Sequence, residues 1–567
     1  MENKEIAEIL YNVADFLEME DNPFRPKAYR RAAHTIEFLT ENISEVREEG
    51  NLEKLPGIGK NIALKIEEIL DTGSLQYLEE LRKEIPVDFD ALMSVEGLGP
   101  KKIKHLYEEL GIKNLEDLEN QAKRHKIRRL KGMGEKSEKN ILENIEFAKK
   151  HGTRKLLGYV LPIAQELKTQ LDELDITDDV KIAGSIRRRK ETIGDIDILV
   201  ITSHPQKVMD FFITMDMVVD VINKGPSKST VRLNEGIECD LRVFKANVFG
   251  AALMYFTGSK ETNVELRRIA IKNNLKLNEY GLFKGKNRIA GESEEELFHK
   301  LGMNYIEPEL RENRGEIEAA TEKKLPELVG YHDIKGDLQI HTKWSDGSHS
   351  LEEMVQSASQ IGYEYIALTD HAGSLKIAGS MDEKRIKEQM KEINKINNGM
   401  DDITILNGVE VNIGSDGKLD VENDLLKDLD IVVASIHSGF RQNEDKITKR
   451  LITAMANENV NIIGHPTSRK IQERQAYDLD LDKIFKVSRE TNTFLEVNSQ
   501  PNRLDLSDVN IKKALEHGCK LVINTDAHSQ DQLKYINLGI ATARRGWATK
   551  MDIINTLSLK KLEKLFN

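Results

Sequence analysis

The sequence predicts a multidomain protein with an all-α N-terminal region, a mixed α/β middle region and a C-terminal distorted β/α barrel. The chain has 567 residues, which is too long for a single hydrophobic core. Residues 1–150 consist of helical runs without an alternating strand pattern, and three glycine turns interrupt them. From Ile334 onward, short apolar strands alternate with helices, which indicates parallel strands that close into a barrel.

The composition is typical of a soluble globular protein. Charged residues make up 32% of the chain, no apolar run reaches membrane-spanning length, and the first residues carry no signal-peptide pattern. Both cysteines, Cys239 and Cys519, lie in apolar surroundings, which favours reduced thiols in a cytoplasmic protein. The net charge of −13 is unusual for a nucleic-acid-binding protein, so we expect basic residues to be concentrated locally and the acidic excess to lie in domains that carry metals.

The N-terminal region repeats a Gly-x-Gly turn in front of a helix, at residues 55–60, 95–101 and 130–136. Paired glycines permit a tight hairpin, and the next helix begins with free N–H groups that can bind a DNA phosphate regardless of base sequence. The turns are similar to helix-hairpin-helix motifs. We expect the first two to bind DNA through Gly57, Gly59, Lys60, Gly97, Gly99 and Lys101. In the third turn Glu135 follows the second glycine and would repel phosphate, so we expect that turn to be structural.

Three carboxylates in the middle region share one pattern. Asp195 and Asp197 alternate with apolar residues, so both face the same side of a predicted strand. Asp240 has the same place in a second predicted strand. If the two strands pair, the three carboxylates converge and require a cation, and hard ions with oxygen ligands such as Mg²⁺ fit best. The alternative is an exposed acidic edge strand.

A turn rich in glycine and arginine precedes these strands. Gly184 and Ser185 leave backbone N–H groups free for a phosphate, and Arg188 can hold phosphate with its fork of donors. Carboxylate-held metals beside a triphosphate cradle favour two-metal phosphoryl or nucleotidyl transfer.

This block resembles the palm of family X DNA polymerases, an α/β nucleotidyltransferase fold. The family pattern of Gly-Ser, Arg-Arg, Asp-x-Asp and a later single Asp is matched, and the resemblance continues into Tyr-Phe-Thr-Gly-Ser at residues 255–259. It implies a palm over residues 151–245 and a thumb over residues 246–310. Residues 311–330 are charged and are expected to form a linker. The resemblance also implies that Tyr255, Phe256, Gly258 and Asn263 bind the nucleotide and that Arg267 contacts the template.

A lysine in the N-terminal region matches a further family position. By resemblance, Lys65 would form a Schiff base with an abasic sugar, and Tyr29 and Arg30 fit neighbouring positions. Residues 1–80 would then form a lyase-like DNA-binding domain, and residues 81–150 a helical fingers-like domain. The alternative is a solvated or phosphate-contacting lysine.

Polar side chains follow almost every predicted strand of the barrel. Because the loops after the strands of a β/α barrel share one rim, these imidazoles and carboxylates are expected to converge into a polynuclear metal centre. The segment 331–567 resembles the PHP (polymerase and histidinol phosphatase) domain. The resemblance implies that Glu410 bridges two metals, that His341 and Asp526 complete the first site, and that His437 and His465 complete the second. It assigns a third metal to Asp346, His371 and His528.

One barrel position departs from the PHP pattern. The pattern opens with His-x-His, whereas this chain has Gln339 before Ile340 and His341. An amide is a poor ligand for a transition metal, so the first metal is expected to bind weakly, to take water instead, or to be Mn²⁺ rather than Zn²⁺.

Together these features predict a monomeric, cytoplasmic, nucleoid-associated bacterial enzyme that fills short gaps in base-excision repair. Its substrates would be gapped or primed DNA and dNTPs, with Mg²⁺ or Mn²⁺ at the polymerase site. Two or three Mn²⁺, Zn²⁺ or Fe²⁺ ions in the barrel would support a 3′→5′ exonuclease and abasic-site cleavage. The alternatives are a nucleotidyltransferase that acts on a small molecule or an RNA end, and a DNA-binding scaffold with a degenerate PHP domain.

Overall fold

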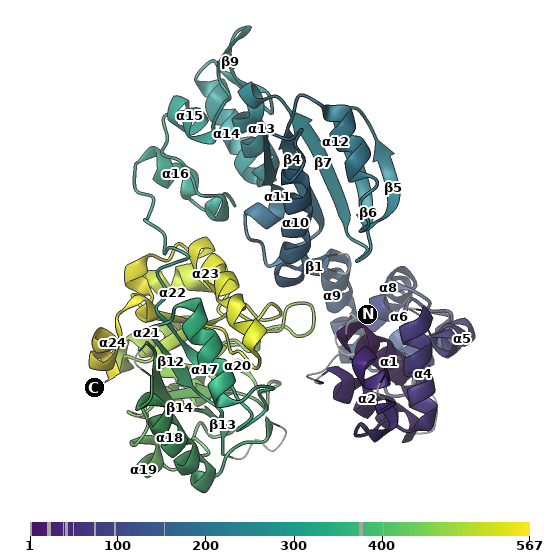
Figure 1. Ribbon diagram of the computed structural model, residues 1–567, viewed down its shortest axis with the longest axis vertical. Coiled ribbons are helices and arrows are strands. Elements are labelled where there is room, and N and C mark those ends of the chain that lie inside the picture. Colours follow the sequence, from purple (N-terminus) through teal and green to yellow (C-terminus); the bar gives the residue numbers. More distant parts are fainter. Residues whose placement is uncertain are drawn as a thin grey trace. The chain divides into compact units, whose positions relative to one another are not determined.

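The computed structural model describes residues 3–19, 24–37, 39, 43–48, 50–72, 75–93, 95, 98–151, 154–373, 378–400 and 402–566. The chain forms two compact units, Met1–Thr153 and Arg154–Asn567. Helices form the first unit, and sheets with covering helices form the second (Figure 1).

Nine α-helices are described in the first unit, and their apolar faces form one core. The helices are α1 (Asn3–Glu18), α2 (Phe24–Glu37), α3 (Ile43–Glu48), α4 (Lys60–Thr72), α5 (Gln76–Glu84), α6 (Phe89–Met93), α7 (Pro100–Leu110), α8 (Leu115–Lys123) and α9 (Glu135–His151). The core runs from Ile6 to Ile145 in the sequence and includes the hairpin residues Ile58, Leu98 and Met133. Each hairpin is therefore attached to the core by the apolar residue between its glycine positions.

Each of the three hairpins contains the same type of backbone hydrogen bond. The N–H of Ile58 donates to the Leu55 carbonyl, and the same bond joins Leu98 to Val95 and Met133 to Leu130, at 3.0–3.1 Å. Gly57 and Gly132 have φ of 84° and 82°, a conformation that favours glycine. The repeat in the sequence is therefore a repeat in the backbone.

The third hairpin is held by buried charge. The Glu138 side chain is buried and accepts bonds from the backbone N–H and the Nε of Arg128, while Glu135 pairs with the same arginine at 3.1 Å. These carboxylates support the prediction that this hairpin has a structural role.

The second unit begins with a mixed sheet, which we call the palm region (residues 154–244). Its sheet has the order β2-β4-β7-β6-β5, and β1 pairs with β3 separately. The elements are β1 (Lys155–Leu156), α10 (Leu157–Asp172), β2 (Asp179–Ile182), α11 (Gly184–Arg187), β3 (Thr192–Ile193), β4 (Asp195–Ile201), α12 (Pro205–Phe212), β5 (Val218–Lys224), β6 (Lys228–Leu233) and β7 (Glu238–Phe244). Residues Ile196, Ile198 and Val200 of β4 pack with α10 and α12 in one core.

The next region, which we call the thumb region (residues 249–321), packs helices around a three-stranded sheet, β10-β9-β8. Its elements are α13 (Phe249–Thr257), α14 (Lys260–Lys272), β8 (Lys276–Asn278), β9 (Gly281–Lys284), β10 (Asn287–Ala290), α15 (Glu294–Lys300) and α16 (Glu316–Thr321). Residues 311–330 were expected to be a charged linker, but much of this segment is integrated into the fold. Arg311 and Glu316 are buried, and Ile317 and Ala320 of α16 join the thumb core.

The barrel is formed by a parallel sheet of order β11-β12-β14-β15-β16-β17-β18, with β13 paired to β14. A parallel bridge between Ile340 and Ala527 brings the two edge strands together, so the barrel is nearly closed. The strands are β11 (Gly336–Ile340), β12 (Tyr365–Leu368), β13 (His371–Ala372), β14 (Thr404–Asn412), β15 (Ile431–Ser435), β16 (Ile462–Ile463), β17 (Phe494–Asn498) and β18 (Leu521–Asn524). The helices are α17 (Leu351–Ile361), α18 (Glu383–Asn397), α19 (Asn423–Leu426), α20 (Glu444–Met455), α21 (Leu481–Thr491), α22 (Asp508–Glu516), α23 (Ile536–Arg545) and α24 (Leu559–Phe566). The strand-and-helix alternation confirms the barrel that the sequence predicts.

The palm region and the barrel pack directly against each other. Leu504 and Leu538 of the barrel belong to the palm core. Arg469 donates to Glu191 at 2.8 Å, and Arg545 donates to the Arg188 carbonyl at 2.7 Å. Apolar packing and these polar contacts together join the two regions.

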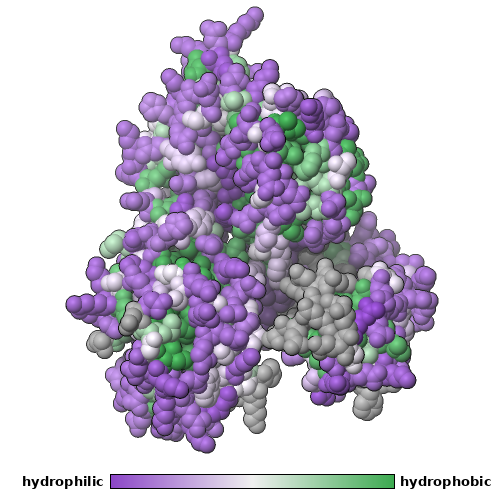
Figure 2. Space-filling model, in the orientation of Figure 1, coloured by the Kyte–Doolittle hydropathy of each residue, from purple (hydrophilic) through white to green (hydrophobic). Residues whose placement is uncertain are grey.

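The visible surface is mostly hydrophilic, with hydrophobic residues gathered at the side where β5 lies (Figure 2). Val219, Val221 and Ile222 of this edge strand are exposed. None of the described helices is long and apolar enough to cross a membrane.

We expect Glu294→Gln to destabilise the thumb region. The Glu294 carboxylate is buried between Arg187, at 2.6 Å, and Arg311, and these arginines lower its pKa to about 2 although burial opposes ionisation. Because the substitution leaves two arginines without their carboxylate, the local free energy of unfolding should fall by about 3–5 kcal/mol. Hydrogen exchange of the α13 and α15 amides measures this change. Glu295→Gln, at the exposed neighbouring position, is the control, and equal exchange in both variants would contradict the expectation.

Candidate functional site

The palm region brings three carboxylates onto one face of its sheet. Strands β4 and β7 are parallel neighbours, and Asp197 pairs with Asp240. Asp195 lies two residues before Asp197, on the face opposite the core residues Ile196 and Ile198. The sequence predicts this convergence only if the two strands pair. The observed register of β4 against β7 shows that they do.

Burial and mutual repulsion act on this cluster. They raise the pKa of Asp197 to about 7, burial contributing most, followed by the charges of Asp195 and Asp240. Burial and Asp240 also raise the pKa of Asp195. Asp240 is held by Thr230 at 2.5 Å and by Lys228 at 2.7 Å. A bound cation would relieve the repulsion, so the donor set fits a divalent metal.

The turn before β4 lies against these carboxylates. Gly184 has φ of +60°, and a Cβ at this position would come within 2.2 Å of the Asp197 Oδ2. Only glycine therefore allows the turn to approach the carboxylate this closely. The hydroxyl of Ser185 is buried and has no hydrogen-bond partner among the described residues, so it is available to a ligand.

Arg188 is engaged within the protein. Its Nε donates to the Glu312 carboxylate at 2.9 Å, and its Nη1 donates to the Thr257 carbonyl. A Cβ at Gly258 would come 3.2 Å from this Nη1, so glycine makes room for the guanidinium. A phosphate at Arg188 would have to replace Glu312.

The aromatic pair at the start of the thumb region is linked to the carboxylates through Arg242, which pairs with Asp240 at 3.1 Å. The Phe256 ring centroid is 4.5 Å from the Arg242 guanidinium and 5.1 Å from the Tyr255 ring. Asn263 donates to the Tyr255 carbonyl at 2.7 Å, and the exposed Arg267 donates to the Asn263 carbonyl at 3.2 Å. These residues form one connected group.

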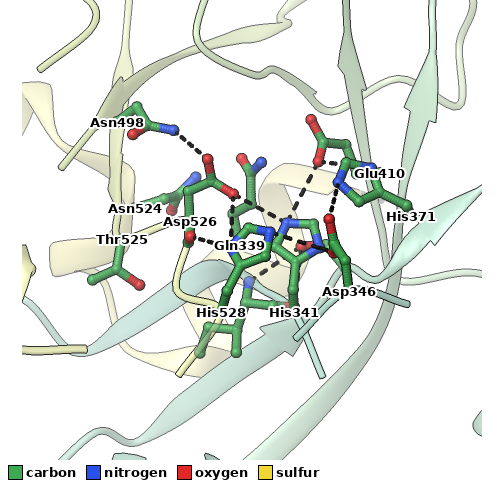
Figure 3. Close-up of polar contacts among 12 residues, drawn as sticks. Gln339, His341, Asp346, His371, Glu410, Asn498, Asn524, Thr525, Asp526 and His528 are labelled. Atoms are coloured by element: carbon green, nitrogen blue, oxygen red, sulfur yellow. Dashed lines mark hydrogen bonds and ion pairs between the residues drawn. The ribbon is translucent and has the colours of Figure 1, made fainter. Parts of the chain in front are cut away.

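A second cluster of titratable groups lies at the barrel, and Figure 3 shows the part of it in which Glu410 lies beside His371 and His341. The Glu410 Oε1 is 3.3 Å from His437 Nε2 and 3.5 Å from His465 Nε2. The Glu410 Oε2 is 3.3 Å from His371 Nδ1 and 3.4 Å from His341 Nε2. One carboxylate thus faces four imidazoles, two at each of its oxygens.

Two further carboxylates extend this cluster. Asp526 Oδ1 lies 3.1 Å from His341 Nε2. Asp346 lies 3.4 Å from His528 and 3.7 Å from His371. Among the described residues, the groups whose ligand atoms lie within 4.8 Å of one another are His341–Asp346–His371–His528, His371–Glu410–His437 and His341–Glu410–Asp526. All eight barrel residues predicted from the sequence therefore lie together, with His465 joined through Glu410.

The electrostatics of this cluster follow from burial and close pairing. Burial alone would lower the pKa of His341, but the hydrogen bond and charge of Asp526 raise it to about 10. Burial lowers the pKa of His371 to about 4, and burial and Arg503 lower that of His465 to about 4. Burial opposes ionisation of Glu410, yet His371 and His437 hold its pKa well below the usual range.

Several buried atoms of this cluster have no hydrogen-bond partner among the described residues. They are the Nδ1 atoms of His341, His437 and His465 and the Oε1 of Glu410. Unsatisfied buried polar atoms are costly, and imidazoles with carboxylates are the usual ligands of Zn²⁺, Mn²⁺ and Fe²⁺. The residues present therefore fit a metal centre.

The sequence places Asp370 and Glu496 among the polar residues that follow the barrel strands, but it assigns them no role and does not single out Asn498. Asn498 donates to Asp526 at 3.0 Å and to Glu496 at 3.2 Å. Asp370 accepts bonds from Thr342 and Ser345 and so fixes the loop that carries Asp346. Glu496 and Asp370 stand at strand ends in the sequence, but only their contacts distinguish a supporting role from a ligand role.

The first unit contains a pocket of about 760 Å³ around Lys65. The Lys65 Nζ lies 4.1 Å from the Tyr77 ring centroid, and burial lowers the pKa of this lysine. Tyr29 and Gly57 line the same pocket, whereas Arg30 pairs with Asp15 at 2.7 Å.

The predicted DNA-binding residues of the hairpins are partly or fully exposed. Lys60 and Lys101 are exposed, and Gly59 and Gly99 begin the turns into α4 and α7. Gly97 lies outside the described residues.

Family models match four parts of the chain. They are a helix-hairpin-helix domain (residues 1–75), a SAM-like helix-hairpin-helix tandem (residues 89–146), a DNA polymerase beta thumb (residues 252–312) and a PHP domain (residues 337–500).

The chain is also similar to curated proteins. It is 39% identical to the DNA polymerase/3'-5' exonuclease PolX of Bacillus subtilis (strain 168) over 571 residues, which cover 99% of each protein. It is 28% identical over 232 residues to a probable phosphatase of Thermoanaerobacter sp. (strain X514), covering 39% of this chain and 90% of that protein. A probable phosphatase of Clostridium acetobutylicum is 30% identical over 203 residues, covering 34% of this chain and 78% of that protein.

We expect Glu410→Gln to reduce the metal bound by the barrel, because an amide cannot supply two anionic oxygens to neighbouring cations. Metal content after dialysis against Mn²⁺ or Zn²⁺, measured by mass spectrometry, should fall by at least one ion per chain. Glu422→Gln, an exposed position of the same barrel, serves as the control. Unchanged metal content in Glu410→Gln would show that Glu410 does not hold the ions.

Proposed function

This chain belongs to the family X DNA polymerases that carry a PHP domain, and from that premise we propose that it joins DNA synthesis with 3′→5′ exonucleolytic degradation at two separate sites. The observation that carries the synthetic activity is the parallel pairing of β4 with β7, which gathers Asp195, Asp197 and Asp240. Its biological task would be to fill short gaps during DNA repair, with gapped or primed DNA and dNTPs as substrates.

We assign the nucleotide to the space between the carboxylates and the start of the thumb region. The N–H groups of the Gly184–Ser185 turn and the unpartnered Ser185 hydroxyl would bind phosphate oxygens. Arg188 would exchange Glu312 for the triphosphate. Mg²⁺ or Mn²⁺ held by the three aspartates would neutralise the triphosphate charge and support departure of pyrophosphate.

The aromatic and thumb residues would set the position of the nucleotide and the template. Tyr255, Phe256 and Gly258 would lie against its sugar, Asn263 against the nascent base pair, and Arg267 against the template strand. The hairpins of the first unit would bind the DNA backbone through N–H groups of their glycine turns and through Lys60 and Lys101.

The barrel would carry the exonuclease. We propose that Glu410 bridges two cations, that His341 and Asp526 complete one site, and that His437 and His465 complete the other. Asp346, His371 and His528 would hold a third. Mn²⁺, Zn²⁺ or Fe²⁺ ions there would supply the Lewis acidity that activates water and stabilises charge on the scissile phosphate. Asn498 would keep Asp526 oriented during this reaction.

The alternatives explain less of the chain. A nucleotidyltransferase for another substrate has no need of the hairpins or of the thumb, and a DNA-binding scaffold has no need of the converging barrel ligands. Similarity along 99% of the chain to a protein named for both activities favours the combined assignment.

Two variants should separate the activities. Asp197→Ala removes a carboxylate from the palm cluster and should slow gap filling by at least about 100-fold while degradation stays unchanged. Glu410→Gln should slow degradation while gap filling stays unchanged. A 5′-labelled primer at a one-nucleotide gap, incubated with Mg²⁺ or Mn²⁺ and with or without dNTPs, reports both reactions. Asp220→Ala, an exposed aspartate on edge strand β5 of the same sheet, is the control for Asp197.

The outcomes discriminate between the assignments. Extension at the normal rate by Asp197→Ala would refute the polymerase site. Persistent degradation by Glu410→Gln would place the nuclease outside the barrel. Loss of both activities in either variant would refute their separation.

A second candidate activity, abasic-site lyase, is favoured by the pocket around Lys65 and by its lowered pKa. The uncharged amine is the nucleophile that adds to the aldehyde of an abasic sugar. Lys65→Ala should lower borohydride trapping of the protein on abasic DNA by at least about tenfold. Lys83→Ala, an exposed lysine of α5, should trap like the unmodified protein. Equal trapping in both variants would assign the lyase nucleophile elsewhere.

A further inference from the structure

Gln339 of β11 is a buried amide whose polar atoms are unsatisfied. Its side chain has 0% exposure, and neither its Oε1 nor its Nε2 has a hydrogen-bond partner among the described residues. Leaving a buried polar group unpaired is costly. By contrast, the carboxylate of Asp337, on the same strand, accepts bonds from Thr525 and from the Gln339 backbone. The Gln339 amide therefore calls for a partner that is not a protein group.

The backbone places this amide inside the barrel. The pairing of β11 with β12 shifts register between Asp337 and Ile340, a type of irregularity that can re-aim a side chain. A Cβ on Gly464 would lie 3.5 Å from the Gln339 Oε1. Gly464 directly follows β16, and β12, β14 and β15 separate β16 from β11 in the sheet. The side chain thus reaches across the barrel interior rather than along its wall.

The end of this side chain lies near metal ligands. Gly464 directly precedes His465, and the same Cβ would lie 2.3 Å from the hydroxyl of Ser435, two residues before His437. Figure 3 shows the Gln339 side chain in the same view as Asp526, His341 and His528. The Ser435 hydroxyl is likewise buried without a partner. The Gln339 amide and the Ser435 hydroxyl are thus unsatisfied polar groups beside the same glycine, which indicates a shared, non-protein ligand.

We propose that the Gln339 carbonyl oxygen is a ligand of one cation in the barrel centre and that it biases this site toward Mn²⁺ over Zn²⁺. This inference rests on the metal centre of the proposed function and goes beyond its ligand set. A carboxamide supplies a neutral, hard oxygen, which suits Mn²⁺ and Mg²⁺, whereas imidazole nitrogen suits Zn²⁺. The side-chain carbonyl has no competing hydrogen bond to give up, so coordination would satisfy it directly.

Three substitutions of similar size separate the contributions of the side chain. Gln339→Met keeps the length but removes the oxygen, Gln339→Glu keeps an oxygen and adds charge, and Gln339→His supplies a nitrogen. The full-length proteins are stripped of metal and titrated with Mn²⁺, followed by electron paramagnetic resonance of the free ion. Zn²⁺ affinity is measured in competition with a chromophoric chelator.

The expected results differ for each variant. Gln339→Met should weaken one Mn²⁺ equivalent by about tenfold, whereas Gln339→Glu should bind it at least as tightly as the unmodified protein. Gln339→His should raise Zn²⁺ affinity by about tenfold or more and should reverse the metal preference. Gap filling by all three variants should be unchanged, which verifies the folding of the chain.

Two results would overturn the inference. The first is a folded Gln339→Met protein that binds Mn²⁺ with unchanged affinity and number, since the amide would then hold only water or nothing. The second is a Gln339→His protein with unchanged Zn²⁺ affinity, which would place the side chain out of reach of the ions.

Measurement of DNA degradation separates this inference from the proposed nuclease. Mn²⁺ binding that depends on Gln339 in a protein that degrades no DNA would refute the nuclease and retain the ligand. Degradation that requires Glu410, combined with metal binding that does not change in the Gln339 variants, would retain the nuclease and refute the ligand.

Discussion

Ionisable side chains gathered in poorly solvated places are the constraint on which both candidate sites depend. In the palm region, burial and two neighbouring aspartates raise the pKa of Asp197 to about 7. In the barrel, Glu410 faces four imidazoles, and buried ring nitrogens remain without partners. In the palm region burial and repulsion both oppose ionisation of Asp197, so this cluster does not stabilise the fold by itself. Cations bound at both places would offset the unfavourable electrostatics and would supply the Lewis acidity needed for catalysis.

The backbone brings these charges together in two ways. In the palm region, neighbouring parallel strands place residues that are far apart in the sequence at the same level, as with Asp197 and Asp240. In the barrel, the segments that follow the strands supply His341, His437, His465 and Asp526 to one end. Glycine permits the closest approaches: Gly184 lies against Asp197 and Gly464 against Ser435, where any side chain would collide.

The two sites belong to one compact unit, and a chain of polar contacts runs between their regions. Glu312 accepts a bond from Arg188 of the palm region and another, at 3.2 Å, from Arg545 of the barrel. Arg545 also pairs with Asp508, which lowers the Asp508 pKa to about 2 against the effect of burial. Arg188 is therefore connected to the barrel helix α23 twice, directly through the bond from Arg545 to its carbonyl at 2.7 Å and indirectly through Glu312.

The sequence by itself determined the order of the architectures, the candidate ligands and the residues of the hairpins. It did so because strand alternation, glycine turns and motif spacing are local properties of the chain. It also gave every residue of the barrel cluster that the structure brings together.

Only the tertiary structure decided which partners those residues have. The register of β4 against β7, the engagement of Arg188 by Glu312, the supporting role of Asn498 and the burial of Arg311 and Glu316 all depend on segments distant in sequence. Charged residues such as those at 311–316 look like a solvated linker until the opposing charges that neutralise them are placed beside them. Packing of the whole core fixes those distances, and no local pattern records them.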